Sequence, residues 1–138
     1  MKILYEAKAT AVGGRDGHVK TSNGSLDLAL AIPKEMGGPG GALPNPEQLF
    51  AAGYAACFEN ALIYVARQRK VRPTGTHVDA TVGIGPREDG GFGLTVRLEV
   101  EIQGVPREQA QALVDAADAT CPYSNAIRGN VPVTVSLI

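Results

Sequence analysis

One stretch of this chain constrains its fold more than any other: an alanine-rich, capped segment that begins at Asn45. Asn45 is a favoured N-cap, Pro46 suits the first helical position, and Gln48 stands where a capping box takes Glu or Gln. The pattern predicts a helix that runs to about Arg69 and ends before Pro73.

The middle of this helix indicates what must surround it. Positions 49–63 are apolar on nearly every side except at Glu59 and Asn60, which is typical of a buried helix. Flanking segments alternate as strands do, most clearly at 93–102. We expect strands at 3–11, 18–21, 26–30, 76–83, 93–102 and 131–137, further helices at 107–119 and 122–127, and an irregular loop at 33–44. The order βββαββααβ predicts an α+β fold in which antiparallel sheets cover a long buried central helix.

Size and composition exclude several classes of protein. At 138 residues the chain is predicted to form a single domain, 1–138, whose core needs no disulfide or metal. Its net charge of −1 gives no basic surface, so we expect no nucleic-acid partner. The N-terminus carries charges where a secretory signal needs an apolar run, and no stretch approaches the roughly 20 apolar residues that span a bilayer. These features predict a cytoplasmic protein with no membrane partner.

Only two cysteines occur, Cys57 within the long helix and Cys121 at the start of the helix 122–127. Two thiols cannot build a disulfide framework for a chain this long, and their spacing is not that of a zinc site. One interpretation is structural: Cys57 as a small buried hydrophobe and Cys121 as a free thiol at a helix junction. The other is a redox pair. In that case burial raises the pKa of Cys57, a cation from elsewhere in the fold must offset it, and the helix start favours the Cys121 thiolate.

Four other polar residues are candidates on weaker grounds. Arg15 lies in the glycine-rich turn 13–17, where most arginines are simply solvated. Glu47 lies in the first turn of the long helix, where the helix dipole alone accounts for a carboxylate. His18 and His77 fall on predicted strands with no third ligand at usable spacing, so we expect no metal site.

Three segments together resemble one known family. They are the turn 13–17 (GGRDG), the stretch 45–58 (NPEQLFAAGYAACF) and the segment 121–126 (CPYSNA). They are similar to the organic hydroperoxide resistance (Ohr) proteins, a branch of the OsmC/Ohr family, and the resemblance covers essentially the whole chain. It implies an OsmC/Ohr-like fold, an intertwined homodimer with active sites at the interface, and an antioxidant thiol peroxidase that reduces organic hydroperoxides in oxidative stress.

The resemblance also implies roles for the candidate residues. Cys57 matches the peroxidatic cysteine, Cys121 matches the resolving cysteine of a redox-active disulfide, and Arg15 with Glu47 matches the activating pair. No bound cofactor or metal is implied. An external dithiol reductant, a lipoylated protein or dihydrolipoamide rather than thioredoxin, is expected to regenerate the two thiols. A guanidinium suits the activating role because it stays protonated.

The spacing of Glu47 and Cys57 suggests how two chains combine. Ten residues on one helix correspond to about 15 Å along its axis and roughly 80° around it, so a straight helix does not easily bring both to one arginine. Small residues fill the span between them and let two helices approach closely. We hypothesise that the central helices of two chains pack antiparallel near Ala52, so that Glu47 of one chain serves Cys57 of the other.

We also expect an apolar substrate pocket around Cys57, with Phe50, Tyr54, Phe58 and Met36 as candidate substrate-binding residues. Such a pocket prefers alkyl, aryl or fatty-acid hydroperoxides to hydrogen peroxide, because burial of hydrocarbon contributes about 25 cal/mol per Å².

Other interpretations remain. The OsmC branch would use the same chemistry in another physiological setting. A redox-sensing or small-ligand-binding module would oxidise once rather than turn over, and a purely structural domain would be indifferent to the loss of the Cys57 thiol.

Overall fold

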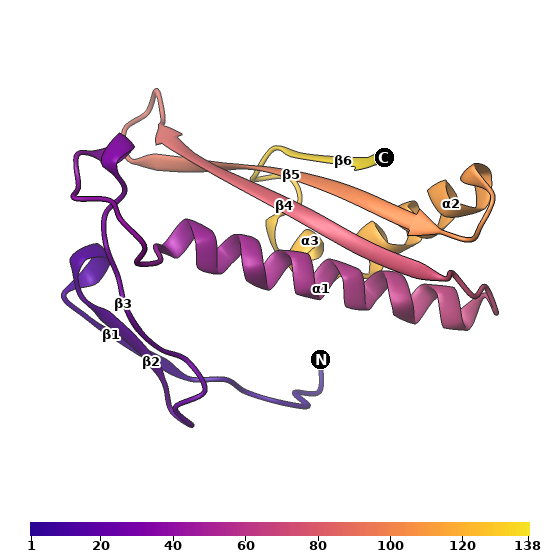
Figure 1. Ribbon diagram of the computed structural model, residues 1–138, viewed down its shortest axis with the longest axis horizontal. Helices are drawn as coiled ribbons and strands as arrows, with labels where there is room; N and C mark the ends of the chain where they lie inside the picture. Colours follow the sequence, from indigo (N-terminus) through magenta and orange to yellow (C-terminus); the bar gives the residue numbers. More distant parts are fainter. The chain divides into compact units, whose positions relative to one another are not determined.

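The computed structural model describes residues 1–138 and holds two three-stranded sheets, one in each of two units, residues 1–49 and 50–138 (Figure 1). The first unit is an antiparallel sheet with the strand order β1-β2-β3, as predicted. Its elements are β1 (Ala9–Val12), the 3-10 helix η1 (Gly14–Asp16), β2 (His18–Thr21), β3 (Asp27–Ala29) and the 3-10 helix η2 (Lys34–Met36).

The first strand is shorter than the predicted 3–11. Pairing between β1 and β2 starts at Ala9 opposite Thr21, and one further hydrogen bond runs from the Ser22 N–H to the Lys8 carbonyl. Residues before Lys8 have no strand partner within this chain, so their alternating pattern is not enough to make a strand.

The long helix α1 (Pro46–Gln68) begins where its cap predicts. The Gln48 N–H donates to Asn45 Oδ1 at 2.9 Å, and the Asn45 N–H donates to Gln48 Oε1 at 3.1 Å. This reciprocal capping box satisfies two N–H groups that a helix start otherwise leaves unpaired, and it confirms the predicted start. The helix begins in the first unit and continues into the second.

The second unit holds the sheet β4-β5-β6 and two more helices. Its elements are β4 (Gly75–Pro86), β5 (Phe92–Gln103), α2 (Arg107–Thr120), α3 (Pro122–Ile127) and β6 (Val133–Leu137). β4 and β5 are antiparallel, but β6 pairs with β5 in parallel, against the expectation of purely antiparallel sheets. The reason is the connection: α2 and α3 lie between β5 and β6 and provide the long crossover that parallel strands need.

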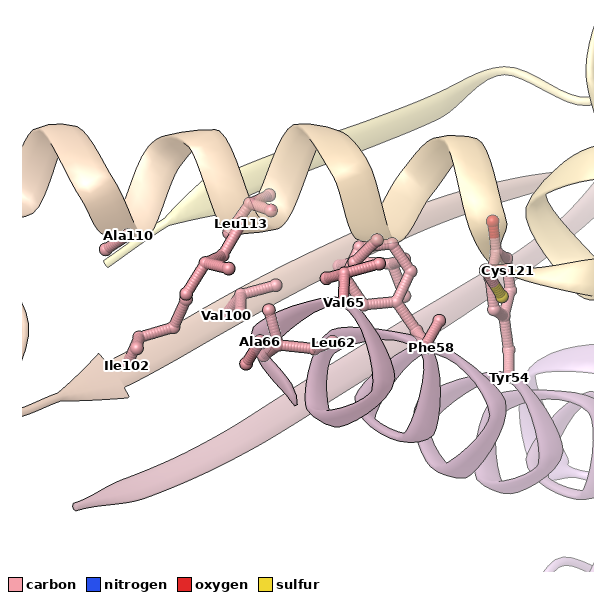
Figure 2. Close-up of a cluster of buried hydrophobic side chains, with 14 of the residues drawn as sticks. Tyr54, Phe58, Leu62, Val65, Ala66, Val100, Ile102, Ala110, Leu113 and Cys121 are labelled. Carbon is pink, nitrogen blue, oxygen red and sulfur yellow. The ribbon is translucent and has the colours of Figure 1, made fainter. Parts of the chain in front are cut away.

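The core of this unit lies between one face of the sheet and the helices α1 and α2 (Figure 2). Val96, Leu98 and Val100 of β5 are buried, whereas the residues between them are partly or fully exposed, so both helices cover the same sheet face. Leu62 of α1 and Leu113 of α2 have no exposed surface. Burial of each such side chain contributes about 1.5–3 kcal/mol.

The expectation that α1 is buried on all sides holds for one face only. Its buried residues are Tyr54, Phe58, Ala61, Leu62, Val65 and Ala66. Ala52, Ala56, Ile63 and Tyr64 are exposed. By length and composition α1 is also apolar enough to cross a membrane, so the expectation that no stretch has this character is wrong for α1. A helix with one face packed on a sheet passes the same test, so this observation is weak support for a membrane span.

Candidate active site

The two cysteines, 64 residues apart in the sequence, lie side by side in the second unit. The Cys57 and Cys121 Sγ atoms are 3.7 Å apart, and both cysteines are reduced. Cys57 is partly exposed on α1, whereas Cys121 is fully buried where α2 ends and α3 begins. A disulfide needs about 2.05 Å between the sulfurs, so a closure of about 1.7 Å would join them. Cys57 therefore has surface that an outside reagent can reach, whereas Cys121 has none.

The surroundings of Cys57 within this unit oppose its ionisation. Burial raises the pKa of the Cys57 thiol, a hydrogen bond from the backbone N–H of Tyr123 lowers it, and the neighbouring Cys121 raises it further. The net pKa of Cys57 is above its ordinary value. The N–H that lowers the pKa of Cys57 belongs to Tyr123, in the first turn of α3.

Arg15 and Glu47 form a two-bond ion pair in the first unit. Arg15 Nη1 donates to Glu47 Oε2 at 2.7 Å, and Nη2 donates to Oε1 at 2.6 Å. The turn that presents Arg15 is built by its glycines: Gly13 has φ +80°, and a Cβ on Gly17 would lie 1.9 Å from the Val12 carbonyl oxygen. The capping box fixes the helix start that carries Glu47.

The geometry of this pair favours the charged form of both groups. Hydrogen bonding to Arg15 holds the pKa of the Glu47 carboxyl below its ordinary 4.5, and the same contact raises the pKa of Arg15. The side chains are 32% and 13% exposed, so the pair is partly shielded from water. The two-bond arrangement orients the guanidinium plane as well as holding its charge. Arg15 is therefore not simply solvated. That its charge acts on the Cys57 sulfur stays a prediction.

The four expected pocket residues differ in accessibility. Tyr54 and Phe58 have no exposed surface and belong to the core. Phe50 is partly buried against that core, and Met36 lies in η2 with 37% of its surface exposed. Phe50 therefore keeps some accessible surface on α1, whereas Tyr54 and Phe58 are covered by the core.

The histidines contact carboxylates instead of forming a cluster. His18 Nε2 is 2.6 Å from Asp27, and His77 is 3.2 Å from Glu101 and 3.4 Å from Asp79. No group of three or more His, Cys, Asp or Glu side chains is placed to hold a metal ion.

Sequence reasoning missed two residues beside the cysteines, Tyr123 and Ser124. Tyr123 supplies the N–H that bonds to Cys57, its ring rests against Gly53 of α1, and Ser124 pairs with the buried Tyr54 hydroxyl at 2.8 Å. One signal was available: a tyrosine in the buried middle of a helix needs a polar partner for its hydroxyl.

Comparison with known proteins shows which family this chain belongs to. Residues 38–136 match the family of OsmC-like proteins. An organic hydroperoxide resistance protein of Xanthomonas axonopodis pv. citri is 51% identical over 137 residues, covering 99% of this chain and 96% of the relative.

Two crystal structures of organic hydroperoxide resistance proteins are similar in fold. That from Elizabethkingia anophelis, with thiocyanate bound, has a TM-score of 0.96 at 51% identity and covers 99% of this chain and 98% of its own. The protein OhrB of Bacillus subtilis has a TM-score of 0.89 at 44% identity and covers 99% and 100%. The chain therefore belongs to the OsmC-like family and, within it, to the organic hydroperoxide resistance proteins.

Proposed function

We propose that this protein detoxifies organic hydroperoxides as a cysteine-based peroxidase. The observation that carries the proposal is the pairing of a partly exposed thiol with a buried one, with 3.7 Å between the sulfurs. Membership of a family named for resistance to organic hydroperoxides supports the same role. A structural core has no need to place its only two cysteines together.

The proposed cycle has two steps at the cysteines. The Cys57 thiolate attacks one peroxide oxygen, the O–O bond breaks, and with one proton the substrate leaves as an alcohol while Cys57 becomes a sulfenic acid. The Cys121 thiol then displaces the sulfenic hydroxyl, which leaves as water, and the Cys57–Cys121 disulfide forms. Cys57 loses two electrons to the peroxide, and the disulfide protects it from further oxidation.

Arg15 is proposed to supply the positive charge that the reaction requires. Burial raises the pKa of Cys57, so at neutral pH the thiolate needs a cation to be well populated. Arginine keeps its charge at any working pH, and Glu47 holds it through two short hydrogen bonds. We also propose that two chains form an intertwined homodimer with active sites at the interface, with Glu47 of one chain serving Cys57 of the other.

Substrate preference and recycling complete the proposal. Phe50 and Met36 are proposed to offer apolar surface to the hydrocarbon part of an alkyl, aryl or fatty-acid hydroperoxide; hydrogen peroxide has no such part. A dihydrolipoyl group on a partner protein would reduce the disulfide by thiol–disulfide exchange and itself become a cyclic disulfide. The cytoplasm is the proposed compartment because it keeps such dithiols reduced.

A steady-state assay tests the proposal. Cumene hydroperoxide should be consumed over many turnovers with dihydrolipoamide and slowly with a thioredoxin system, and Cys57→Ser should abolish turnover. Hydrogen peroxide should be a poorer substrate by kcat/KM. A single turnover despite excess dithiol would favour a redox sensor, and full activity of Cys57→Ser would overturn the assignment of the peroxidatic cysteine.

A further inference from the structure

A buried hydrogen bond links the two segments that carry the cysteines. The Tyr54 and Ser124 hydroxyl oxygens are 2.8 Å apart, with Tyr54 fully buried and Ser124 only 3% exposed. It is the one side chain–side chain hydrogen bond of the second unit that is buried at both ends. Burial raises the pKa of Tyr54, so its phenol stays protonated and keeps a proton to donate or share.

This hydrogen bond joins the same two segments of the chain as the pair of sulfurs does. Tyr54 precedes Cys57 by three residues, about one turn of α1, and Ser124 follows Cys121 by three residues in α3. Figure 2 shows the Tyr54 side chain rising from α1 toward Cys121. The same two segments are thus joined twice, by two hydroxyls at 2.8 Å and by two thiols at 3.7 Å.

Aromatic packing brings α1 and α3 together but does not fix the position of one segment along the other. The Tyr54 and Tyr123 rings are 5.8 Å apart between centroids, and a Cβ on Gly53 would lie 3.2 Å from the Tyr123 hydroxyl. Apolar contacts have little directional preference, whereas a hydrogen bond weakens steeply with angle and distance. Closing the last 1.7 Å or so between the sulfurs requires Cys121 to be held in register with Cys57.

We propose that the Tyr54–Ser124 hydrogen bond is a positioning device for disulfide formation. It holds Cys121 in register with Cys57 and so favours the step in which the Cys57 sulfenic acid and the Cys121 thiol condense to a disulfide and water. It does not act on the attack on peroxide. The inference rests on the proposed function for its role in turnover, but the effect on the cysteine pair is measurable without any peroxide.

The test compares Tyr54→Phe, Ser124→Ala and the double variant with Tyr64→Phe, which changes an exposed tyrosine of the same helix. The first readout is the equilibrium of the Cys57–Cys121 disulfide against oxidised and reduced dithiothreitol. Because the reduced protein already makes this hydrogen bond, its loss in Tyr54→Phe should lower the equilibrium constant by at most roughly twelve-fold, the full value of one net hydrogen bond. The double variant should be no worse than Ser124→Ala alone, because both substitutions remove the same interaction.

The second readout separates positioning from general damage to the fold. The rate constant of Cys57 with cumene hydroperoxide should stay within about two-fold of the wild type in Ser124→Ala, while more Cys57 sulfinic acid should accumulate per turnover. A disulfide equilibrium no different from that of Tyr64→Phe, or an equal loss in the peroxide step, would overturn the inference. If Tyr54→Phe does not fold, Ser124→Ala gives the same comparison. A wild type with no peroxidase activity, but with the shifted equilibrium in Tyr54→Phe, would reject the proposed function and leave this inference standing.

Discussion

Replacing Glu47 by Gln removes one charge from the Arg15 pair and keeps the shape of the side chain. The pair makes two charge-assisted hydrogen bonds at 2.6 and 2.7 Å. Bonds to charged groups contribute about 1.5–3 kcal/mol each when well shielded, but exposed ion pairs contribute about 0–1 kcal/mol. With side chains 32% and 13% exposed, the pair lies between these cases. We expect Glu47→Gln to lower the free energy of unfolding by about 1–2 kcal/mol at pH 7.

The chain offers a matched control for burial. Arg87 and Asp89 also form two hydrogen bonds, at 2.8 and 2.5 Å, but their side chains are 54% and 63% exposed. Asp89→Asn should therefore change the free energy of unfolding by no more than about 0.5 kcal/mol. Urea denaturation followed by circular dichroism measures both variants. Equal losses in the two variants would refute the claim that partial burial strengthens the Arg15–Glu47 pair.

The effect should also depend on pH. The native pKa of Glu47 is below its ordinary 4.5, so the unfolded chain binds the proton more readily. The stability from this group is therefore present above pH 4.5 and lost as the pH falls through the native pKa. The difference between the wild type and Glu47→Gln should shrink below pH 4.5. A difference that stays constant from pH 7 down to acid pH would show that the carboxylate charge is not its source.

Three further predictions concern the cysteines and the turn. In Cys121→Ser the sulfenic acid of Cys57 should persist and advance to sulfinic acid under excess peroxide, seen by mass spectrometry; a stable product without overoxidation would contradict the resolving role. In Arg15→Ala the apparent pKa of Cys57, followed by its alkylation rate against pH, should rise, because burial raises it and no cation opposes; an unchanged profile would remove Arg15 from the mechanism. Gly17→Ala should lower the free energy of unfolding by about 1–3 kcal/mol or more, because the new Cβ would lie 1.9 Å from a backbone oxygen. Gly85→Ala places its Cβ in open space and should leave this free energy nearly unchanged. Comparable losses in the two variants would refute the steric argument.

Local signals in the sequence predict most of the elements. The capping box at Asn45 and Gln48 fixes the start of α1, and alternation in 93–102 identifies β5. Both signals depend on residues within a few positions of one another, so they can be recognised without knowledge of the tertiary structure. The first strand shows the limit of such signals: residues 3–7 alternate but have no partner strand within this chain.

The rest depends on contacts between distant segments. The parallel pairing of β6 follows from how α2 and α3 return the chain to the sheet, which no local pattern encodes. The resemblance to a family assigned Cys57 and Cys121, but not the 3.7 Å between their sulfurs. The Tyr54–Ser124 hydrogen bond joins residues 70 apart in the sequence, so neither residue shows its partner until the chain is folded.

The most direct measurement uses the fully reduced protein and a single equivalent of cumene hydroperoxide. Peptide mapping and quantitation of the organic product then report both halves of the reaction at once. The account predicts one equivalent of the alcohol together with a disulfide that joins Cys57 to Cys121. Consumption of the peroxide with both thiols still free, or oxidation of Cys121 while Cys57 stays reduced, would contradict it.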